Sequence, residues 1–548
     1  MSAPGRPKRE SSLGEAVAQR PEGRPFSAPG RPKRESSLMP HVWPTVVHML
    51  QDAARRAPEH PALRCGNEEL SYRQYAACVA GLALELQERG IGAGQRVALM
   101  MANSLDIAVA TFAVQAAGAQ AVPLNPAYTS AELGPILADA APALLLHDVA
   151  VAGAVAGCRE ALASVVAVAV GEGARRLTAW RDQPELAERL PLPSAETLST
   201  LQYTGGTTGV SKGVDLGHRA VSINVSQREA LLSTRPEGER ILAITPLFHV
   251  YAVSMGLYLA AYCRGTLVIL PRYRPDWVLE AIARERITLL SGSPTIFVGL
   301  MAYEGFGQAD LGSLRLCFSG SSALSEETLR RWEVATGCVV AEGYGQSEAG
   351  PVLTYNPSEG LRKLGTVGYA VPQTEIQIVD VATGREPLPV GEIGEIRARG
   401  PQIMSGYRNR PAETAEALRD GWLYTGDIGS LDTDGYLTIR DRKKDMAIVS
   451  GFNVYPRQVE DALYSHSAVI EAAVVGLPDA YRGESLVASV VCRQAVTVED
   501  LQAHLQARLV KYKWPSELRV VTALPKTTVG KIDKKQLRLD LLAETNTA

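Results

Sequence analysis

The chain has 548 residues, of which 46% are hydrophobic and 21% are charged, and its formal net charge is −3. This length predicts more than one domain, and the composition is typical of a globular protein with enough apolar residues for a sizeable core. A chain so close to neutrality is not expected to bind nucleic acid by neutralising phosphates.

The chain begins with a duplicated polar segment. Residues 2–13 read SAPGRPKRESSL, and residues 27–38 repeat these letters without a change. Because a segment rich in Pro, Gly, Arg and Ser has almost nothing to bury, we expect residues 1–38 to be a disordered tail. It contains no apolar run for a secretory signal, and its several glutamates are unusual for a transit peptide. A duplicated upstream tract is therefore favoured over a targeting arm.

Short apolar runs alternate with helical patterns from residue 97 onward. Residues 97–101 predict a strand and 105–117 an Ala-rich helix, and the same pair follows at 121–124 and 131–138. Further strands are expected at 198–203, 241–245, 266–270, 287–291 and 314–318. Strands separated by helices predict an α/β fold of parallel sheets with right-handed crossovers.

The pattern changes after residue 365. Residues 375–379 and 392–398 alternate with the two-residue period of half-buried strands, which predicts a β-rich subdomain. A short α+β segment follows from about residue 441 to the end. We therefore expect a large N-terminal domain at 39–441 and a small C-terminal domain at 442–548.

One uncharged stretch, residues 241–263, is long enough to span a bilayer. It contains Pro246 and His249 and begins like a strand, so a buried strand, loop and helix is favoured over a membrane span. The seven cysteines are scattered and form no CxxC pair. They predict reduced thiols in a cytoplasmic protein, with no metal site.

The strongest local motif is YTGGTTGVSKG at residues 203–213, directly after an expected strand. Its glycines let the backbone approach a ligand, and its amides and hydroxyls can bind phosphate. It is not a Walker A loop, because no Gly-Lys-Ser/Thr closes it. The residues that we expect to bind phosphate are Thr204, Gly205, Gly206, Thr207, Thr208, Gly209 and Lys212.

The order of motifs resembles the adenylate-forming family, which comprises acyl-CoA ligases, peptide-synthetase adenylation domains and firefly luciferase. After the glycine loop come GYGQSE at 343–348, YTGD at 424–427, DRKKD at 441–445 with VSGFNVYP at 449–456, and LPKTTVGK at 524–531. The resemblance covers residues from about 45 to 540. It implies ATP and coenzyme A as substrates, Mg²⁺ as cofactor, and a mobile C-terminal domain.

The resemblance assigns nucleotide-binding roles to single residues. Tyr344 matches the aromatic residue that stacks on adenine, within a motif that also contains Gly345. Ser347 matches the hydroxyl that binds the α-phosphate. Asp427 and Arg442 are similar to the ribose contacts. Glu348 matches the Mg²⁺ ligand and Thr204 is a second metal candidate, since Mg²⁺ takes hard oxygen ligands beside a polyphosphate.

Three residues of the C-terminal part receive catalytic or transfer roles by the same resemblance. Lys531 matches the cation that bridges the attacking carboxylate and the α-phosphate, where it offsets developing negative charge. Lys444 matches the hinge between an adenylating and a thioester-forming pose. Gly451 matches a glycine in the pantetheine tunnel, where a side chain would obstruct the thiol. Glu348 and Ser347 complete the expected catalytic set.

The expected acyl pocket includes His249, Val250 and Tyr251, because PLFHVY at 246–251 is similar to the family segment that flanks this pocket. Gly320 is expected in the same pocket. Residues 252–261 are apolar and offer no cation for a second carboxylate, which favours a hydrophobic acid. The motifs are most similar to those of bacterial long-chain fatty-acyl-CoA ligases, apart from Gln346 and Ser347, where that group has Leu-Thr.

Other functions remain open at this stage. Ligases for aryl or alicyclic acids share these motifs, and a carrier-protein-loading adenylase would form adenylate without using free coenzyme A. A luciferase-like oxygenase would need a luciferin, whereas a non-catalytic ATP-binding protein is expected to lack Lys531 or Glu348. The expected partners are a small carboxylic acid, ATP and coenzyme A, with peripheral membrane association at most.

Overall fold

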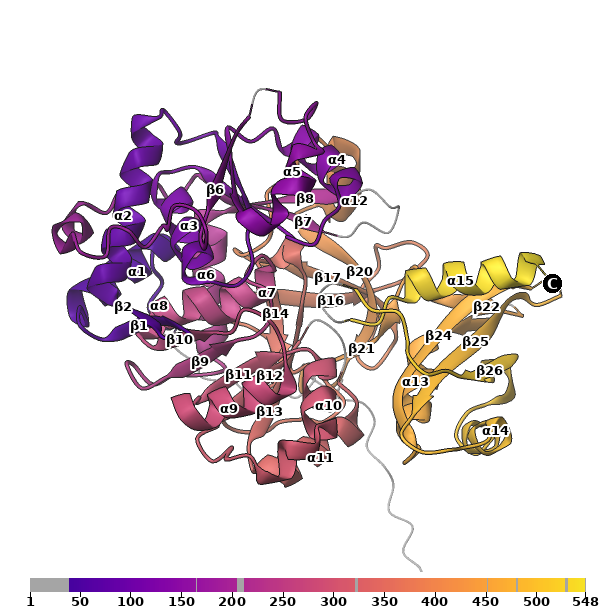
Figure 1. Cartoon of the computed structure of the whole chain (residues 1–548). Helices are drawn as coiled ribbons and strands as arrows, with labels where there is room; N and C mark the ends of the chain where they lie inside the picture. Colours follow the sequence, from indigo (N-terminus) through magenta and orange to yellow (C-terminus); the bar gives the residue numbers. More distant parts are fainter. Residues whose placement is uncertain are drawn as a thin grey trace, which may run out of the picture. The chain divides into compact units, whose positions relative to one another are not determined.

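The computed structural model of the chain describes residues 39–163, 165–204, 211–320, 324–450, 452–479, 481–527 and 531–547. Two large sheets, a smaller antiparallel sheet and a C-terminal sheet make up this part of the chain (Figure 1). The expected α/β fold is confirmed. The expectation of a disordered tail concerns residues 1–38, which lie outside the described residues.

The largest sheet has nine strands in the order β15-β14-β13-β12-β11-β9-β10-β1-β2. Its central strands are parallel, and the antiparallel strands β2, β14 and β15 lie toward its two edges. Helices α9, α10 and α11 lie together beside it (Figure 1). The strands are β1 (Pro61–Cys65), β2 (Glu68–Ser71), β9 (Arg240–Ala243), β10 (Thr266–Ile269), β11 (Leu289–Gly292), β12 (Leu316–Ser319), β13 (Val339–Gly345), β14 (Val352–Tyr355) and β15 (Tyr369–Ala370).

The second sheet has seven strands in the order β18-β8-β7-β4-β3-β5-β6. Strands β4, β3, β5, β6 and β7 pair in parallel, whereas β8 and β18 are antiparallel to their neighbours. The strands are β3 (Arg96–Met100), β4 (Gln120–Leu124), β5 (Leu144–Asp148), β6 (Val166–Val170), β7 (Leu198–Thr204), β8 (Lys212–Gly217) and β18 (Gly406–Tyr407). The glycine-rich motif begins at the end of β7 and extends into β8, and these two strands are antiparallel.

The helices of the large domain cover and connect these sheets. All twelve residues of α3 are buried, which explains why most of them are apolar. Helix α2 begins with a capping box between Ser71 and Gln74, which satisfies free amides at its N-terminus. The helices are α1 (Val46–Arg56), α2 (Tyr72–Glu88), α3 (Leu105–Ala116), α4 (Ser130–Ala140), α5 (Ala152–Ala156), α6 (His218–Glu229), α7 (Val250–Ala252), α8 (Leu259–Cys263), α9 (Pro275–Glu285), α10 (Pro294–Ala302), α11 (Glu326–Thr336) and α12 (Pro411–Ala417).

The uncharged stretch 241–263 forms strand β9, a loop, α7, a π-helix (Val253–Tyr258) and α8. The expected strand, loop and helix are therefore confirmed. Among the described residues, no helix is long and apolar enough to cross a membrane. The π-helix is one feature that the apolar pattern did not predict, because a run without charges has no visible period.

Two smaller sheets follow in sequence. The first is antiparallel and contains β16 (Glu375–Val379), β17 (Gly394–Arg399), β19 (Leu418–Arg419), β20 (Trp422–Leu431) and β21 (Leu437–Arg442), which confirms the expected β-rich segment. The second contains β22 (Ala447–Val449), β23 (Phe452–Val454), β24 (Val469–Asp479), β25 (Gly483–Cys492) and β26 (Glu517–Val520). The domain boundary between residues 441 and 442 stays a prediction.

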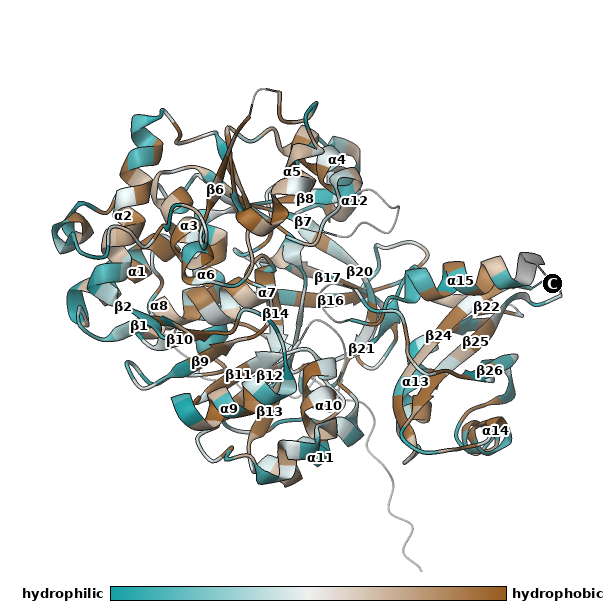
Figure 2. Cartoon of the chain, in the orientation of Figure 1, coloured by the Kyte–Doolittle hydropathy of each residue, from teal (hydrophilic) through white to brown (hydrophobic). Residues whose placement is uncertain are grey.

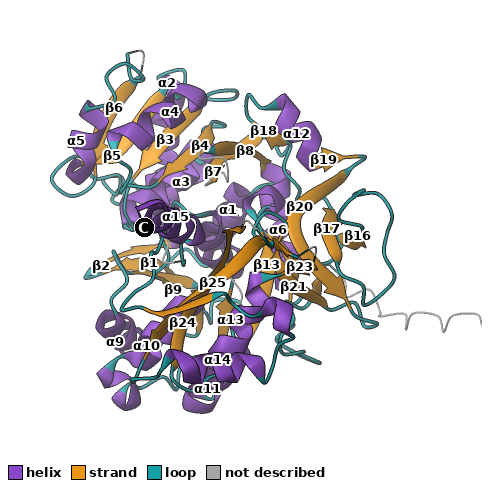
Figure 3. Cartoon of the chain, turned by 90° about the vertical axis from the view of Figure 1, so that its right-hand side faces the viewer, coloured by secondary structure: helices purple, strands orange, loops and turns teal. Residues whose placement is uncertain are grey.

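Three helices pack on the C-terminal sheet (Figure 3): α13 (Pro456–Tyr464), α14 (Val498–Gln506) and α15 (Lys534–Thr547). Helix α15 alternates between teal and brown in Figure 2, as expected of a helix with one apolar face. Its Leu537 and Leu541 are buried against β24 and β25 together with Leu524. This packing holds the segment that leads to Lys531.

Candidate functional site

The two ends of the expected phosphate-binding loop lie opposite each other. Thr204 ends β7, Lys212 begins β8, and the two residues are paired in the antiparallel register. The Thr204 hydroxyl donates to the Lys212 carbonyl at 3.5 Å. Five of the expected loop residues, Gly205, Gly206, Thr207, Thr208 and Gly209, lie outside the described residues, so their role stays a prediction.

A tyrosine that the sequence analysis missed connects the phosphate-binding strand to the expected metal ligand. The ammonium of Lys212 lies 5.0 Å from the ring centre of Tyr407. The Tyr407 hydroxyl donates to Glu348 Oε1 at 2.8 Å. Strand β18 pairs with β8, which places Tyr407 beside this carboxylate. Burial raises the pKa of Glu348. A nearby cation or metal ion would favour its ionised form.

A tight backbone turn positions the motif residues after β13. A Cβ atom on Gly345 would stand 1.9 Å from the Pro351 carbonyl oxygen, so only glycine fits here. Ser347 begins a 3₁₀ turn (Ser347–Ala349), and the Glu348 carbonyl accepts from the Met404 amide at 2.9 Å. This turn carries the two expected catalytic side chains, Ser347 and Glu348, at the end of the strand that supplies Tyr344.

A tyrosine, an aspartate and an arginine from three strands meet beside this turn. The Tyr344 hydroxyl, on β13, donates to Asp427 Oδ2 at 2.6 Å. Arg442 Nε lies 3.8 Å from Asp427 Oδ1, because Asp427 on β20 and Arg442 on β21 are directly opposite each other. Burial raises the pKa of Asp427, and the Arg442 charge opposes this shift. An acceptor carboxylate beside an aromatic ring suits a ribose diol next to a flat base.

Lys531 reaches the same neighbourhood from the C-terminal part of the chain. Its backbone is held by Thr527, whose hydroxyl accepts from the Lys531 amide at 3.2 Å. Burial, followed by the charge of Arg442, lowers the pKa of Lys531 to about 8. Burial, with a smaller contribution from Lys531, lowers the pKa of His249 to about 3. The lysine therefore lies within electrostatic range of the expected ribose contacts and the expected acyl gate.

The lowered pKa of Lys531 predicts a pH limit on adenylation. The ammonium form is the one that can offset negative charge, and it is lost as the pH rises through about 8. We expect kcat/KM for ATP to fall above about pH 8 in a profile of pyrophosphate release. Lys531→Arg is the matched control, because a guanidinium stays protonated and should remove this alkaline limb. If kcat/KM still falls above about pH 8 in the arginine variant, the fall is caused by the titration of another group.

The expected acyl residues divide into two groups. Tyr251 and Gly320 face each other closely, since a Cβ atom on Gly320 would stand 3.0 Å from the Tyr251 ring. Val250 lines an apolar cavity instead, together with Leu216, Val221, Leu247 and Val253. His249 caps α7 by accepting from the Tyr251 amide at 3.3 Å. These contacts place apolar walls beside the gate that the sequence analysis expected.

Of the two expected transfer residues, only Lys444 is described, and its charge acts on Asp427 and Arg442. Lys444 follows β21 and is exposed, while its neighbour Lys443 is the residue that pairs with Glu395, at 2.9 Å. Gly451 lies outside the described residues. Their hinge and tunnel roles stay predictions.

Comparison with known proteins gives matches over nearly the whole chain. Residues 50–408 match the family model described as AMP-binding enzyme, and residues 458–531 match its C-terminal domain model. The long-chain-fatty-acid–CoA ligase of Bacillus subtilis (strain 168) is 36% identical over 538 residues, which cover 91% of this chain and 96% of that protein. The feruloyl-CoA synthase of an Amycolatopsis species is 36% identical over 491 residues, covering 88% and 96%.

A solved structure agrees with these matches. The crystal structure of ATP-bound MatB from Rhodopseudomonas palustris superposes with a TM-score of 0.83 at 31% identity, covering 91% of this chain and 98% of that one. The two family models together include the residues from Thr204 to Glu348 and also Lys531.

Proposed function

Because the chain belongs to the AMP-binding, adenylate-forming family that includes acyl-CoA ligases, we propose that it activates a hydrophobic carboxylic acid as its acyl-adenylate and transfers the acyl group to coenzyme A. The observation that carries this proposal is the contact of Tyr344, Asp427 and Arg442, which come from three strands, with Lys531 of the C-terminal segment within electrostatic range of the last two. Such a group of side chains suits a nucleotide whose α-phosphate is attacked by a carboxylate.

In the first half-reaction, the carboxylate oxygen attacks the α-phosphorus of ATP and pyrophosphate leaves. Asp427 accepts hydrogen bonds from the ribose hydroxyls, and Tyr344 packs against the adenine. The Lys531 ammonium contacts both the incoming carboxylate and the α-phosphate, so it lowers the repulsion between two anions. In the second half-reaction, the thiol of coenzyme A attacks the acyl carbon and AMP leaves.

A magnesium ion fits the donor set near the triphosphate. Glu348 offers a carboxylate, and the Tyr407 hydroxyl contacts only one of its two oxygens. The Thr204 hydroxyl is a second candidate ligand. Mg²⁺ is usually held by one or two carboxylates together with substrate phosphates. When bound, the ion would neutralise charge on the phosphates, and Glu348 would hold it in place.

We propose a medium- to long-chain fatty acid as the substrate. The fatty-acid name of the Bacillus subtilis relative supports this assignment, as does the apolar lining contributed by Leu247, Val250 and Val253. An aryl acid is the second candidate, and the feruloyl-CoA synthase relative favours it. Both candidates are tested by measuring pyrophosphate release with and without coenzyme A. The acids compared run from acetate to palmitate and include benzoate and cyclohexanecarboxylate.

The fatty-acid assignment predicts a dependence on chain length. Each methylene that becomes buried contributes up to about 0.8 kcal/mol, or roughly fourfold in kcat/KM. We therefore expect kcat/KM to rise from acetate to at least octanoate. An enzyme that prefers acetate, or that prefers benzoate to every fatty acid, would contradict the fatty-acid part and leave the ligase part intact. Pyrophosphate release that never requires or responds to coenzyme A would favour a carrier-loading adenylase instead.

A further inference from the structure

A buried arginine on helix α6 has hydrogen-bonding capacity that the described residues do not use. The Arg228 side chain is 0% exposed. Its Nη1 donates to Glu229 Oε2 at 3.0 Å and to the Leu232 carbonyl. Among the described residues, Nε and Nη2 have no hydrogen-bond partner. Leaving buried donors unpaired is costly, which is why most buried polar groups in proteins are satisfied.

Three polar side chains within two turns of Arg228 on the same helix do find partners. Ser222 and Ser226 donate to the Trp43 and His41 carbonyls at 2.6 and 2.8 Å. Asn224 exchanges two hydrogen bonds with the backbone of Val352, each at 2.9 Å. At the start of the same helix, His218 is buried as well, and its two ring nitrogens have no hydrogen-bond partner among the described residues. Arg228 differs from it in carrying a permanent charge and two unused N–H donors.

A chain of close contacts connects Arg228 to the expected acyl pocket. The guanidinium carbon lies 4.7 Å from the centre of the Phe318 ring on β12. Two residues later, Gly320 faces the Tyr251 ring, with 3.0 Å between that ring and an added Cβ atom. The Tyr251 hydroxyl in turn lies 3.4 Å from that of Tyr355. The charge of Arg228 also acts on the hydroxyls of Tyr251 and Tyr355, so Arg228 lies close to two residues that adjoin the expected acyl pocket.

The charge balance decides which chemical group suits these donors. Glu229 already neutralises the Arg228 charge at 3.0 Å. A second carboxylate would therefore leave a net negative charge in a buried place, which is strongly unfavourable. A hydroxyl, ether or carbonyl oxygen accepts the free N–H groups without adding charge. The Phe318 ring beside the guanidinium is an apolar neighbour for the rest of such a molecule.

We propose that Arg228 determines substrate specificity by binding a neutral oxygen on the distal part of the acid, so that the preferred substrate is an oxygenated acid with an apolar body. This inference rests on the proposed function, which supplies the carboxyl end and its activation. It adds to the inference from residues 252–261, because the proposed polar contact comes from α6 and lies outside that segment.

The wild-type enzyme provides the first test. Pyrophosphate release is measured with octanoate, with hydroxyoctanoates carrying the hydroxyl at carbons 4 to 8, and with octanedioate. Cinnamate and 4-hydroxycinnamate form a parallel aromatic arm, so the two arms distinguish an aliphatic from an aromatic body. We expect at least one oxygenated acid to exceed its plain counterpart by roughly 10- to 100-fold in kcat/KM. Octanedioate should be no better than octanoate.

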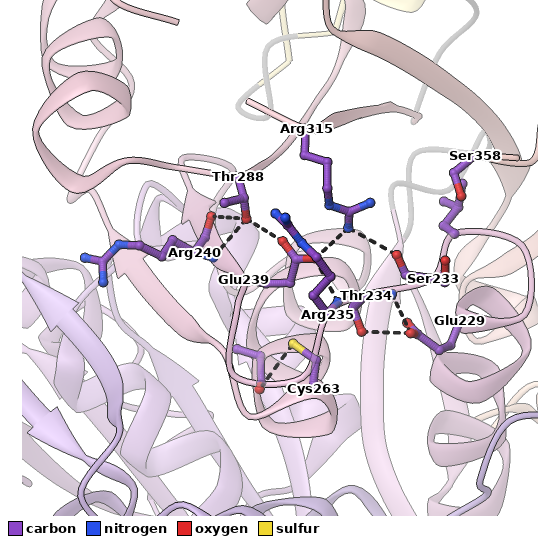
Figure 4. A network of polar contacts seen from close by, with 12 residues as sticks. Glu229, Ser233, Thr234, Arg235, Glu239, Arg240, Cys263, Thr288, Arg315 and Ser358 are labelled. Atoms are coloured by element: carbon purple, nitrogen blue, oxygen red, sulfur yellow. Dashed lines mark hydrogen bonds and ion pairs between the residues drawn. The ribbon is translucent and has the colours of Figure 1, made fainter. Parts of the chain in front are cut away.

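The variants assign this preference to the arginine. Arg228→Met keeps a long apolar side chain and removes the donors, so the ratio of oxygenated to plain acid should fall toward one. Arg228→Lys keeps a cationic donor and should retain part of the preference. Arg315→Met is the matched control: Arg315 also has an unpartnered Nε, but it pairs with Glu239 at 2.6 Å at the opposite end of β12 (Figure 4). That variant should keep the wild-type ratio, whatever its stability.

The outcomes distinguish a failure of the proposed function from a failure of the role proposed for Arg228. If no acid releases pyrophosphate, the proposed function fails. If octanoate or cinnamate reacts but the wild type prefers no oxygenated acid to its plain counterpart, only the role of Arg228 is overturned. This result does not depend on whether Arg228→Met folds. The role of Arg228 is also overturned if a folded Arg228→Met variant keeps the wild-type ratio of kcat/KM for oxygenated to plain acid, or if the wild type prefers octanedioate to octanoate.

Discussion

Lys531→Ala is expected to lower the rate of acyl-AMP formation by about 10²–10³, the usual cost of removing a preorganised group that stabilises transition-state charge. The side chain is needed only while carboxylate and α-phosphate react, so the variant should convert synthetic acyl-AMP and coenzyme A to thioester at nearly the wild-type rate. Rapid-quench assays with labelled ATP measure the first half-reaction, and thioester formation from acyl-AMP measures the second.

Gly451→Leu is the complementary variant for this experiment. A side chain in the expected pantetheine tunnel should leave adenylation intact and block the thiol, so the enzyme would release pyrophosphate once and retain acyl-AMP. Equal loss of both half-reactions in both variants, at an unchanged melting temperature, would show that the two steps do not use separate residues. The proposed alternation of poses would then be wrong for this protein.

Asp427→Ala is expected to lower kcat/KM for ATP by about 10²–10⁴. A buried carboxylate that accepts from two ribose hydroxyls makes two charge-assisted hydrogen bonds, each worth about 1.5–3 kcal/mol. The melting temperature of the free enzyme should change far less, because the hydrogen bonds to the ribose form only when ATP is bound. Initial rates over a range of ATP concentrations, with the melting temperature of the free enzyme, measure both effects.

Tyr344→Phe is the matched control for Asp427→Ala. It keeps the ring and removes only the hydroxyl that donates to Asp427 at 2.6 Å, which ribose hydroxyls can replace. We expect its kcat/KM for ATP to stay within about tenfold of the wild type, since a neutral hydrogen bond contributes about 0.5–1.5 kcal/mol. If Asp427→Ala leaves the KM for ATP unchanged, the ribose binds at another place.

Much of the fold could be predicted because buried parallel strands are continuous apolar runs. The expected strand 97–101 and helix 105–117 occur as β3 (Arg96–Met100) and α3 (Leu105–Ala116). The hairpin of β1 and β2 was not predicted, since its letters PALRC and EELS mix apolar and charged residues in strands of only five and four residues. Its pairing with β10 depends on contacts distant in sequence, which no local pattern reveals.

The site could be predicted only where a motif marks it. The sequence HRAVSINVSQRE of α6 looks like an exposed helix, yet most of its residues are buried, so Arg228 could not be distinguished from a surface cation. Tyr407 was missed for a related reason: its contact with Glu348 arises from the pairing of β18 with β8, nearly 200 residues apart in the chain. By contrast, Asp427 and Arg442 each lie in a motif of the expected family, so the sequence marked both, and they lie 3.8 Å apart in the structure.

The position of β1 in the nine-stranded sheet has a consequence for protein synthesis. Its parallel partner β10 follows on the order of 200 residues later in the chain. At a translation rate of about 5–20 residues per second, β1 leaves the ribosome about 10–40 s before β10 does. During this interval the nascent hairpin of β1 and β2 exposes an unpaired strand edge, a surface on which other chains can aggregate. Co-translational protection of that edge would therefore be needed until β10 emerges.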